Sequence, residues 1–130
     1  MGRVLLIDDE QLICEIFATV LAMEGRFSTS AGSSGEQLCA LLDAHDDVVA
    51  VLCDQTLSGE TGIAIHATIE PTLRARRIAF ILVHGGGPEF RETLPDGYFA
   101  DHRIAEVFKP MSHIMDIIRI VEAEITKARV

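Results

Sequence analysis

Short apolar runs constrain the fold of this chain more than any other feature of its sequence. The strongest runs are residues 4–7, 48–53 and 78–83, and a weaker one covers residues 104–108. Their apolar side chains are continuous rather than alternating, which is typical of strands buried on both faces of a parallel sheet. Residues 26–31 alternate more clearly and predict an edge strand.

Between these runs, apolar residues recur at three- and four-residue spacing, which indicates amphipathic helices. The first of these helices is expected to end at Gly25. The second helix is predicted to begin near Ser34, whose hydroxyl can cap backbone amides while Gln37 reaches back. A helix start of this kind supports a strand-helix alternation in the first half of the chain.

The second half of the chain continues the alternation. A third helix is predicted over about residues 60–70, where Pro71 stops it, and another over residues 114–125. Residues 85–101 have little periodicity and are expected to hold a short helix and a loop. Five alternations predict a doubly wound α/β fold, with a five-stranded parallel sheet and helices on both faces. The length suits one domain over residues 1–130.

Charge and composition exclude several classes of protein. The net charge of −9 opposes direct binding to nucleic acid or to an anionic membrane. The one basic cluster, Arg74, Arg76 and Arg77, is interpreted as a solvated turn.

No apolar stretch approaches the roughly 20 residues of a membrane-spanning helix or resembles a secretory signal. The three cysteines lack CxxC spacing and indicate small buried thiols. We therefore expect a soluble, cytoplasmic protein.

Polar residues stand at the carboxyl end of each of the four stronger strands: Asp8 and Asp9, then Asp54, His84 and Lys109. Ligands bind to open parallel sheets at this edge. Three carboxylates, an imidazole and an ammonium are therefore expected at one rim of the molecule.

The three carboxylates need a positive partner. At 4 Å, each pair would repel by about 4 kcal/mol at an effective dielectric constant of 20. Carboxylate oxygens with room for water suit Mg²⁺, which often shares its ligands with a phosphoryl group. The Lys109 ammonium could stabilise phosphoryl oxygens. The rim therefore predicts a magnesium and phosphoryl site.

Each of these residues also has a simpler explanation. Asp8, Asp9 and Glu10 would suit a helix N-terminus because the helix dipole favours negative charge there. Asp54 could be a turn residue after a strand, and Lys109 a surface lysine. Their joint occurrence at successive strand ends favours a common site.

Three motifs carry a family resemblance: VLLIDDE at residues 4–10, VLCD at residues 51–54 followed by Gly62, and FKP at residues 108–110. In this order and at this spacing, the chain resembles the receiver domain of two-component response regulators over essentially its whole length. The resemblance implies a flavodoxin-like fold with strand order 2-1-3-4-5. It is compatible with a single-domain regulator and with the receiver of a hybrid histidine kinase.

The resemblance also implies roles for the rim residues in a phosphorelay. Asp54 would accept a phosphoryl group from a histidine kinase or phosphotransfer protein. Asp9, Asp54 and the backbone carbonyl of Thr56 would bind Mg²⁺, with Asp8 acting largely through water, and Lys109 would contact the phosphoryl group. Self-catalysed phosphorylation and dephosphorylation would be the only enzymatic activity. Further expected partners are a downstream protein target and, as an option, a second copy of the chain.

Two strand positions depart from the family pattern, and in the loop after Asp54, Leu57-Ser58 stands where Met-Pro is frequent. His84 stands where the family has Ser or Thr, and it is either a modified, pH-sensitive switch or a tolerated substitution that weakens switching. Glu106 stands where Tyr or Phe is common, and Phe108 should lie on the same strand face. The Lys109-Pro110 bond is expected to be cis by family resemblance, at a cost of about 0.5–1 kcal/mol.

Other functions remain open at this stage. His84 and Glu106 favour a degenerate pseudo-receiver that serves as an interaction module, whereas Asp8, Asp9, Asp54 and Lys109 oppose it. A phosphohydrolase of the haloacid dehalogenase type would usually carry its nucleophile on the first strand, followed two residues later by Asp. A flavodoxin would have a Ser/Thr-rich phosphate loop after the first strand, which this sequence lacks.

Overall fold

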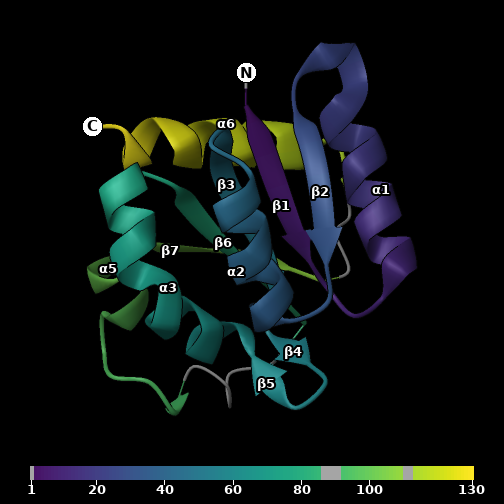
Figure 1. The fold of residues 1–130 in the computed structure, drawn as a ribbon. Helices are drawn as coiled ribbons and strands as arrows, with labels where there is room; N and C mark the ends of the chain where they lie inside the picture. Colours follow the sequence, from purple (N-terminus) through teal and green to yellow (C-terminus); the bar gives the residue numbers. More distant parts are fainter. Residues whose placement is uncertain (1, 86–91, 110–112) are drawn as a thin grey trace.

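The computed structural model describes residues 2–85, 92–109 and 113–130. Its central feature is a parallel sheet of five strands in the order β2-β1-β3-β6-β7 (Figure 1). The strands are β1 (Arg3–Ile7), β2 (Ser28–Gly32), β3 (Val48–Asp54), β6 (Ala79–His84) and β7 (Ile104–Phe108). This order confirms the predicted arrangement 2-1-3-4-5, because β6 and β7 are the fourth and fifth long strands of the chain. The predicted edge strand is also confirmed.

Helices cover both faces of the sheet, as predicted (Figure 1). They are α1 (Gln11–Ala22), α2 (Gly35–Ala44), α3 (Gly62–Arg76), α5 (Tyr98–Asp101) and α6 (Asp116–Ala128). A short 3₁₀ turn, η1 (Met23–Gly25), ends the first helical segment where Gly25 was expected to end it. In the described residues, no helix has both the length and the apolar character needed to cross a membrane.

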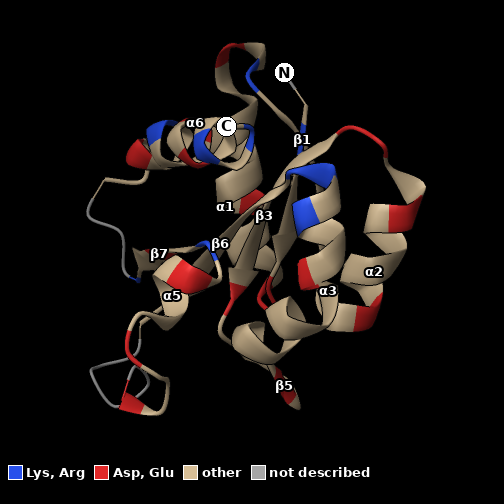
Figure 2. Cartoon of the chain, turned by 90° about the vertical axis from the view of Figure 1, so that its left-hand side faces the viewer, with Lys and Arg blue, Asp and Glu red and all other residues tan. Residues whose placement is uncertain are grey.

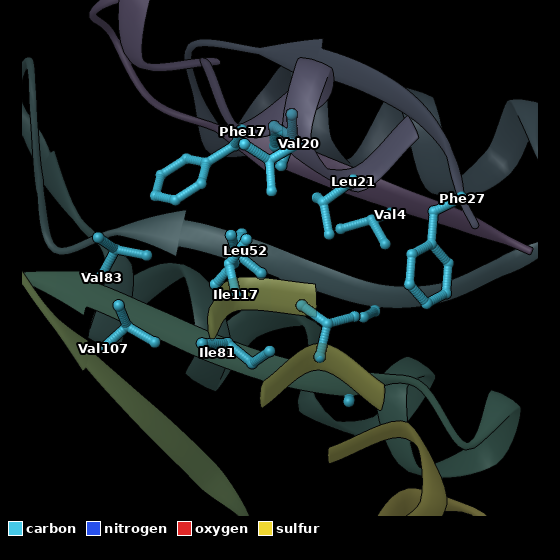
Figure 3. Packing of buried hydrophobic residues seen from close by; sticks show 14 of the residues in the cluster. Val4, Phe17, Val20, Leu21, Phe27, Leu52, Ile81, Val83, Val107 and Ile117 are labelled. Atoms are coloured by element: carbon cyan, nitrogen blue, oxygen red, sulfur yellow. The ribbon is translucent and has the colours of Figure 1, made fainter. Parts of the chain in front are cut away.

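Two apolar clusters hold the layers together, one on each face of the sheet. Figure 3 shows the first cluster, in which Phe17 and Leu21 of α1 and Ile117 of α6 pack against Leu52 and Ile81 of the sheet. The second cluster joins residues of α2 and α3 to the alternate side chains of the same strands. All seven residues of β3 are buried, which explains why this run is continuously apolar.

The second helix begins at Ser34, as expected. The Ser34 hydroxyl accepts a hydrogen bond from the Gln37 N–H at 3.1 Å. The Gln37 side chain reaches back to accept a hydrogen bond from the Ser33 N–H at 2.7 Å. These bonds satisfy backbone donors that have no partner within the helix.

The predicted end of the third helix at Pro71 is wrong, because α3 continues through Pro71 to Arg76. An internal proline removes one backbone hydrogen bond and costs about 3 kcal/mol. The apolar stripe of Ile65, Ile69 and Leu73 crosses this position and packs into the second cluster. Burial of Leu73, at about 1.5–3 kcal/mol, helps to offset the cost.

The cysteines are free, and two of them, Cys14 and Cys53, are buried as predicted. Burial raises the pKa of the Cys53 thiol to about 12, so this thiol stays protonated and unreactive. Cys39 is exposed, which corrects the prediction that all three are buried. Its side chain lies on the outer face of α2, away from the buried Leu38 and Leu42.

Candidate functional site

The carboxyl edge of the sheet brings together three of the predicted site residues. Asp8 follows β1, Asp54 is the last residue of β3, and Lys109 follows β7. The Lys109 Nζ atom lies 3.2 Å from Asp8 Oδ2 and 3.3 Å from Asp54 Oδ1. The Lys109 ammonium therefore bridges two carboxylates that come from positions far apart in the sequence.

Asp9 completes an acidic cluster with Asp8 and Asp54. One oxygen from each carboxylate lies within 4.8 Å of the others. Asp8 and Asp54 are 7% and 8% exposed, whereas Asp9 is exposed. An all-oxygen cluster that opens to solvent on one side fits Mg²⁺, which keeps several of its waters. The donor set therefore agrees with the predicted metal.

The charges of the cluster are only partly balanced by the protein itself. Burial, and then the charge of Asp8, raise the pKa of the Asp54 carboxyl, and Lys109 offsets this only in part. Burial alone would lower the pKa of the Lys109 ammonium, but the charges of Asp54 and Asp8 outweigh it and raise that pKa.

The raised pKa of Asp54 has a consequence for stability. Between the unfolded pKa, near 4, and the higher folded one, the folded state binds more protons, so stability falls as the pH rises through this window. At neutral pH the ionised Asp54 therefore opposes folding, and a divalent cation at the cluster would relieve that cost.

The acidic run at residues 8–10 does more than begin a helix. Asp8 Oδ1 accepts a hydrogen bond from the Glu10 N–H at 2.9 Å, just before α1. The first turn of α1 contains no acidic residue, and the side chain of Glu10 makes no capping bond. The other Asp8 oxygen meets Lys109. The simpler explanation, a dipole-stabilised helix start, therefore accounts for only one of the two carboxylate oxygens of Asp8.

Backbone and side chains from the loop after β3 complete the rim. The backbone of Thr56 acts to lower the pKa of the Asp54 carboxyl, so the structure brings Thr56 to the site; the predicted metal contact of its carbonyl stays a prediction. Ser58 was missed in the sequence, and its Oγ lies 3.3 Å from Asp9 Oδ2. Nothing local in the sequence indicates this contact between two loops.

Gly62, which follows the VLCD motif in the family resemblance, is required by close packing. It begins α3, and a Cβ atom at this position would lie 2.7 Å from the backbone oxygen of Asp54 and 2.6 Å from Leu82 Cδ1. Such distances are too short for any side chain. The glycine therefore allows the first turn of α3 to support the end of β3 directly.

His84 is buried at the end of β6, and the carboxylate that it meets is Glu106. His84 Nε2 lies 2.8 Å from Glu106 Oε2. The His84 ring also packs edge-on against Phe108, with ring centroids 4.8 Å apart. The predicted shared face of Glu106 and Phe108 is thus confirmed. Through its backbone oxygen, His84 accepts a hydrogen bond from the Lys109 N–H at 2.9 Å. The predicted cis bond at Lys109-Pro110 lies outside the described residues.

Comparisons with known proteins agree with this geometry. A response regulator receiver domain protein from Clostridium thermocellum is 18% identical with a TM-score of 0.81, covering 99% of this chain and 98% of that one. A sensor protein from Polaromonas sp. JS666 is 17% identical with a TM-score of 0.82, covering 98% of both chains. A CheY-like receiver domain protein from Methanospirillum hungatei JF-1 is 17% identical with a TM-score of 0.78, covering 99% of this chain and 97% of that one.

At these identities, the structural likeness establishes the fold alone. No curated protein matches the sequence. The family model of the response regulator receiver domain, however, matches residues 4–100, which is most of the chain. The chain belongs to the family of response regulator receiver domains of two-component systems.

Proposed function

We propose that this chain is a phosphoacceptor in a two-component phosphorelay and that Asp54 receives the phosphoryl group. The observation that carries the proposal is the position of Lys109, whose ammonium lies within 3.3 Å of both Asp8 and Asp54. A cation held there can stabilise the negative charge that a phosphoryl group brings to Asp54. Asp8, Asp9, Lys109 and the backbone of Thr56 surround the same carboxylate.

Asp9, Asp54 and the backbone carbonyl of Thr56 would hold Mg²⁺, and Asp8 would act largely through water. When bound, the metal would offset the charge of the carboxylates and of the incoming phosphoryl oxygens. Residues of the chain hold the carboxylates and the phosphoryl group in position. Lys109 orients Asp54 and contacts the phosphoryl group, and Glu10 keeps Asp8 in place through its backbone N–H.

The transfer would proceed by in-line attack of an Asp54 carboxylate oxygen on phosphorus. An oxygen–phosphorus bond forms while the bond between phosphorus and the imidazole nitrogen of the donor breaks, and the departing ring takes a proton from water. The ionised carboxylate needs no general base. Hydrolysis of the resulting acyl phosphate would return Asp54 to its starting state.

The partners in this proposal follow from the chemistry. The donor is a histidine kinase or a phosphotransfer protein, and the recipient of the signal is a downstream protein, with a second copy of the chain as an option. Residues 1–130 would act as one receiver unit. The only enzymatic activity is self-catalysed phosphorylation and dephosphorylation at Asp54.

A second candidate is a pseudo-receiver that binds partners without switching. It is favoured by the buried contact of His84 with Glu106 at the two positions where the family pattern differs. This candidate and the first one differ in whether the chain takes up phosphoryl groups at all.

Incubation with acetyl phosphate and Mg²⁺, followed by intact-mass measurement, tests the proposal. We expect one added phosphoryl group per chain, and its loss when EDTA replaces Mg²⁺, because the uncompensated carboxylates repel the donor. An unchanged mass after prolonged incubation with Mg²⁺ would favour the pseudo-receiver.

Magnesium should also stabilise the folded chain, because it binds a cluster that the unfolded chain lacks. At about ten times the dissociation constant, the gain is about 1.4 kcal/mol, which raises the melting temperature by about 5 °C. A thermal-shift titration measures this effect. In the variant Asp54→Asn the rise should be clearly smaller, and an equal rise would place the ion elsewhere.

A further inference from the structure

A groove lies at the edge of the sheet opposite to the aspartate cluster. It has a volume of about 700 Å³, and its walls come from the second half of α3, the beginnings of β6 and β7, α5 and the end of α6. Small-molecule sites commonly have volumes of about 300–1,000 Å³. The groove is therefore large enough for a ligand of the size of a nucleotide.

The groove is more basic than the protein as a whole. Four cationic side chains line it, Arg74, Arg77, Arg103 and Lys127, against two carboxylates, those of Glu70 and Glu124. The chain itself carries a net charge of −9. Figure 2 shows that much of the blue of Lys and Arg gathers at the end of the molecule that carries both termini. The interpretation of Arg74 and Arg76 as a solvated turn is wrong, because both lie in the last turn of α3.

The two carboxylates already have partners within the groove. Glu70 lies 2.9 Å from His102 Nδ1 and 3.2 Å from Arg74. The hydrogen bond from His102 lowers the pKa of Glu70, which keeps this carboxylate ionised. Glu124 lies 3.0 Å from Lys127. Arg74 and Lys127 thus pair with the two carboxylates of the groove.

Arg77 and Arg103 are the remaining cations. Neither guanidinium has a hydrogen bond or ion pair within the described part of the chain, and both side chains are exposed. Both residues have left-handed backbone conformations, with φ of 55° and 57°. Arg77 caps the end of α3, and Arg103 precedes β7. The fold therefore places the backbones of two arginines without ion pairs along one groove.

Part of the lining of the groove is apolar and buried. Leu73, Phe80 and Ile104 line it and are buried. His66 also lines it and is 1% exposed, yet its Nδ1 has no hydrogen-bond partner among the described residues. Burial lowers the pKa of the His66 imidazole, so the ring is neutral. Buried polar atoms are almost always paired in folded proteins, so an unpaired one in the wall of a groove points to a ligand.

We propose that this groove binds a small organic phosphate of about the size of a nucleoside monophosphate. The planar guanidinium groups of Arg77 and Arg103 match the oxygens of a phosphate. The apolar part of the lining suits an organic body, and His66 Nδ1 can pair with a polar atom on that body. A long nucleic acid would extend beyond the groove over a protein of net charge −9, so a compact anion fits the charge distribution better.

Titration of the parent chain with AMP in buffer containing EDTA tests this site. The readout is the change in the NMR chemical shifts of the backbone amides and of the histidine rings. We expect saturable shifts at Arg77, Arg103 and the His66 ring. The variant Arg77→Glu should weaken binding by about tenfold or more, the loss of one charged hydrogen-bond partner. The matched control is Arg119→Glu. Arg119 is exposed on α6, pairs with Asp116 at 2.8 Å and lies outside the groove, so its replacement should change the affinity by less than about twofold.

The outcomes of this experiment separate the groove from the phosphoacceptor site. The variant Asp54→Asn should bind AMP as the parent does, whatever the result for phosphorylation. The proposal is overturned if AMP does not saturate, if the shifts gather around Asp8 and Asp9, or if Arg119→Glu weakens binding as much as Arg77→Glu. Equal binding of inorganic phosphate, with no shift of the His66 ring, would show an adventitious ion only and also overturn it.

Discussion

The variant Asp54→Asn is expected to take up no phosphoryl group from acetyl phosphate, under conditions in which the parent chain is modified once. The amide oxygen of asparagine is uncharged and a poor nucleophile, so no acyl phosphate forms. The replacement keeps the size of the side chain at a position where Asp54 is 8% exposed and close to Lys109. Intact-mass measurement reads the result directly.

The variant should fold at least as well as the parent in the absence of metal. Burial and the charge of Asp8 raise the pKa of Asp54, so removal of this charge relieves a repulsion at neutral pH. Loss of phosphorylation can therefore be separated from loss of structure by a denaturation curve measured on the same sample.

Asp47→Asn is the matched control, because Asp47 is exposed and pairs with Arg3 at 3.1 Å, outside the aspartate cluster. This variant should be modified to the same extent as the parent. Modification of Asp54→Asn at the full level of the parent would move the acceptor to another residue and refute the assignment.

The residue pattern was sufficient to predict a parallel sheet and the meeting of Asp8, Asp54 and Lys109 at its carboxyl edge, whereas the strand order came from the resemblance to receiver domains. Continuous apolar runs place the strands, and the carboxyl ends of parallel strands must share one edge. Each of these residues stands at the carboxyl end of a predicted strand, so its place on this edge follows from the strand positions. The prediction needed no knowledge of side-chain conformation.

Features that depend on packing between distant segments could not be predicted from the sequence. The contact of Ser58 with Asp9 joins two loops that are 49 residues apart in the chain. The continuation of α3 beyond Pro71 depends on burial of Leu73 against the sheet, which the local rule for proline cannot include. The pairing of Arg74 with Glu70 likewise appears only once α3 is known to continue.

For His84, the sequence was sufficient to predict an unusual residue at this position but not its contacts. Its place at a strand end marks it as unusual, since the family has a small hydroxyl there. The structure adds the partner: His84 Nε2 lies 2.8 Å from Glu106 Oε2, and the ring packs against Phe108. Both of these departures from the family pattern thus meet in one buried contact.

We expect this contact to weaken the transmission of a signal from Asp54 to the β7 face and to leave phosphorylation intact. In the proposed function, phosphorylation depends on Asp54, Lys109 and the metal. Transmission in the family depends on a small hydroxyl that moves toward the new anion and frees space behind it. In this chain the His84 imidazole fills that space and is held by Glu106 before any phosphoryl group arrives.

A contact that is already made in both states contributes nothing to the shift between them, because an equilibrium moves only by a differential interaction. The variant His84→Thr should therefore enlarge the phosphorylation-dependent change at Glu106, Val107 and Phe108, by about twofold or more in amide chemical shift on addition of beryllofluoride, a phosphoryl mimic. The extent of modification by acetyl phosphate should stay similar.

The variant Glu106→Gln keeps the size of the side chain and the buried imidazole, so it separates the bulk of His84 from the charge of Glu106 as the cause of weakened transmission. If the bulk of His84 blocks transmission, Glu106→Gln should respond as the parent does; if the charge of Glu106 holds the ring in place, it should respond more like His84→Thr. Equally large changes in His84→Thr and in the parent chain would show that His84 is a competent switch residue, and the expectation of weakened transmission would then be wrong.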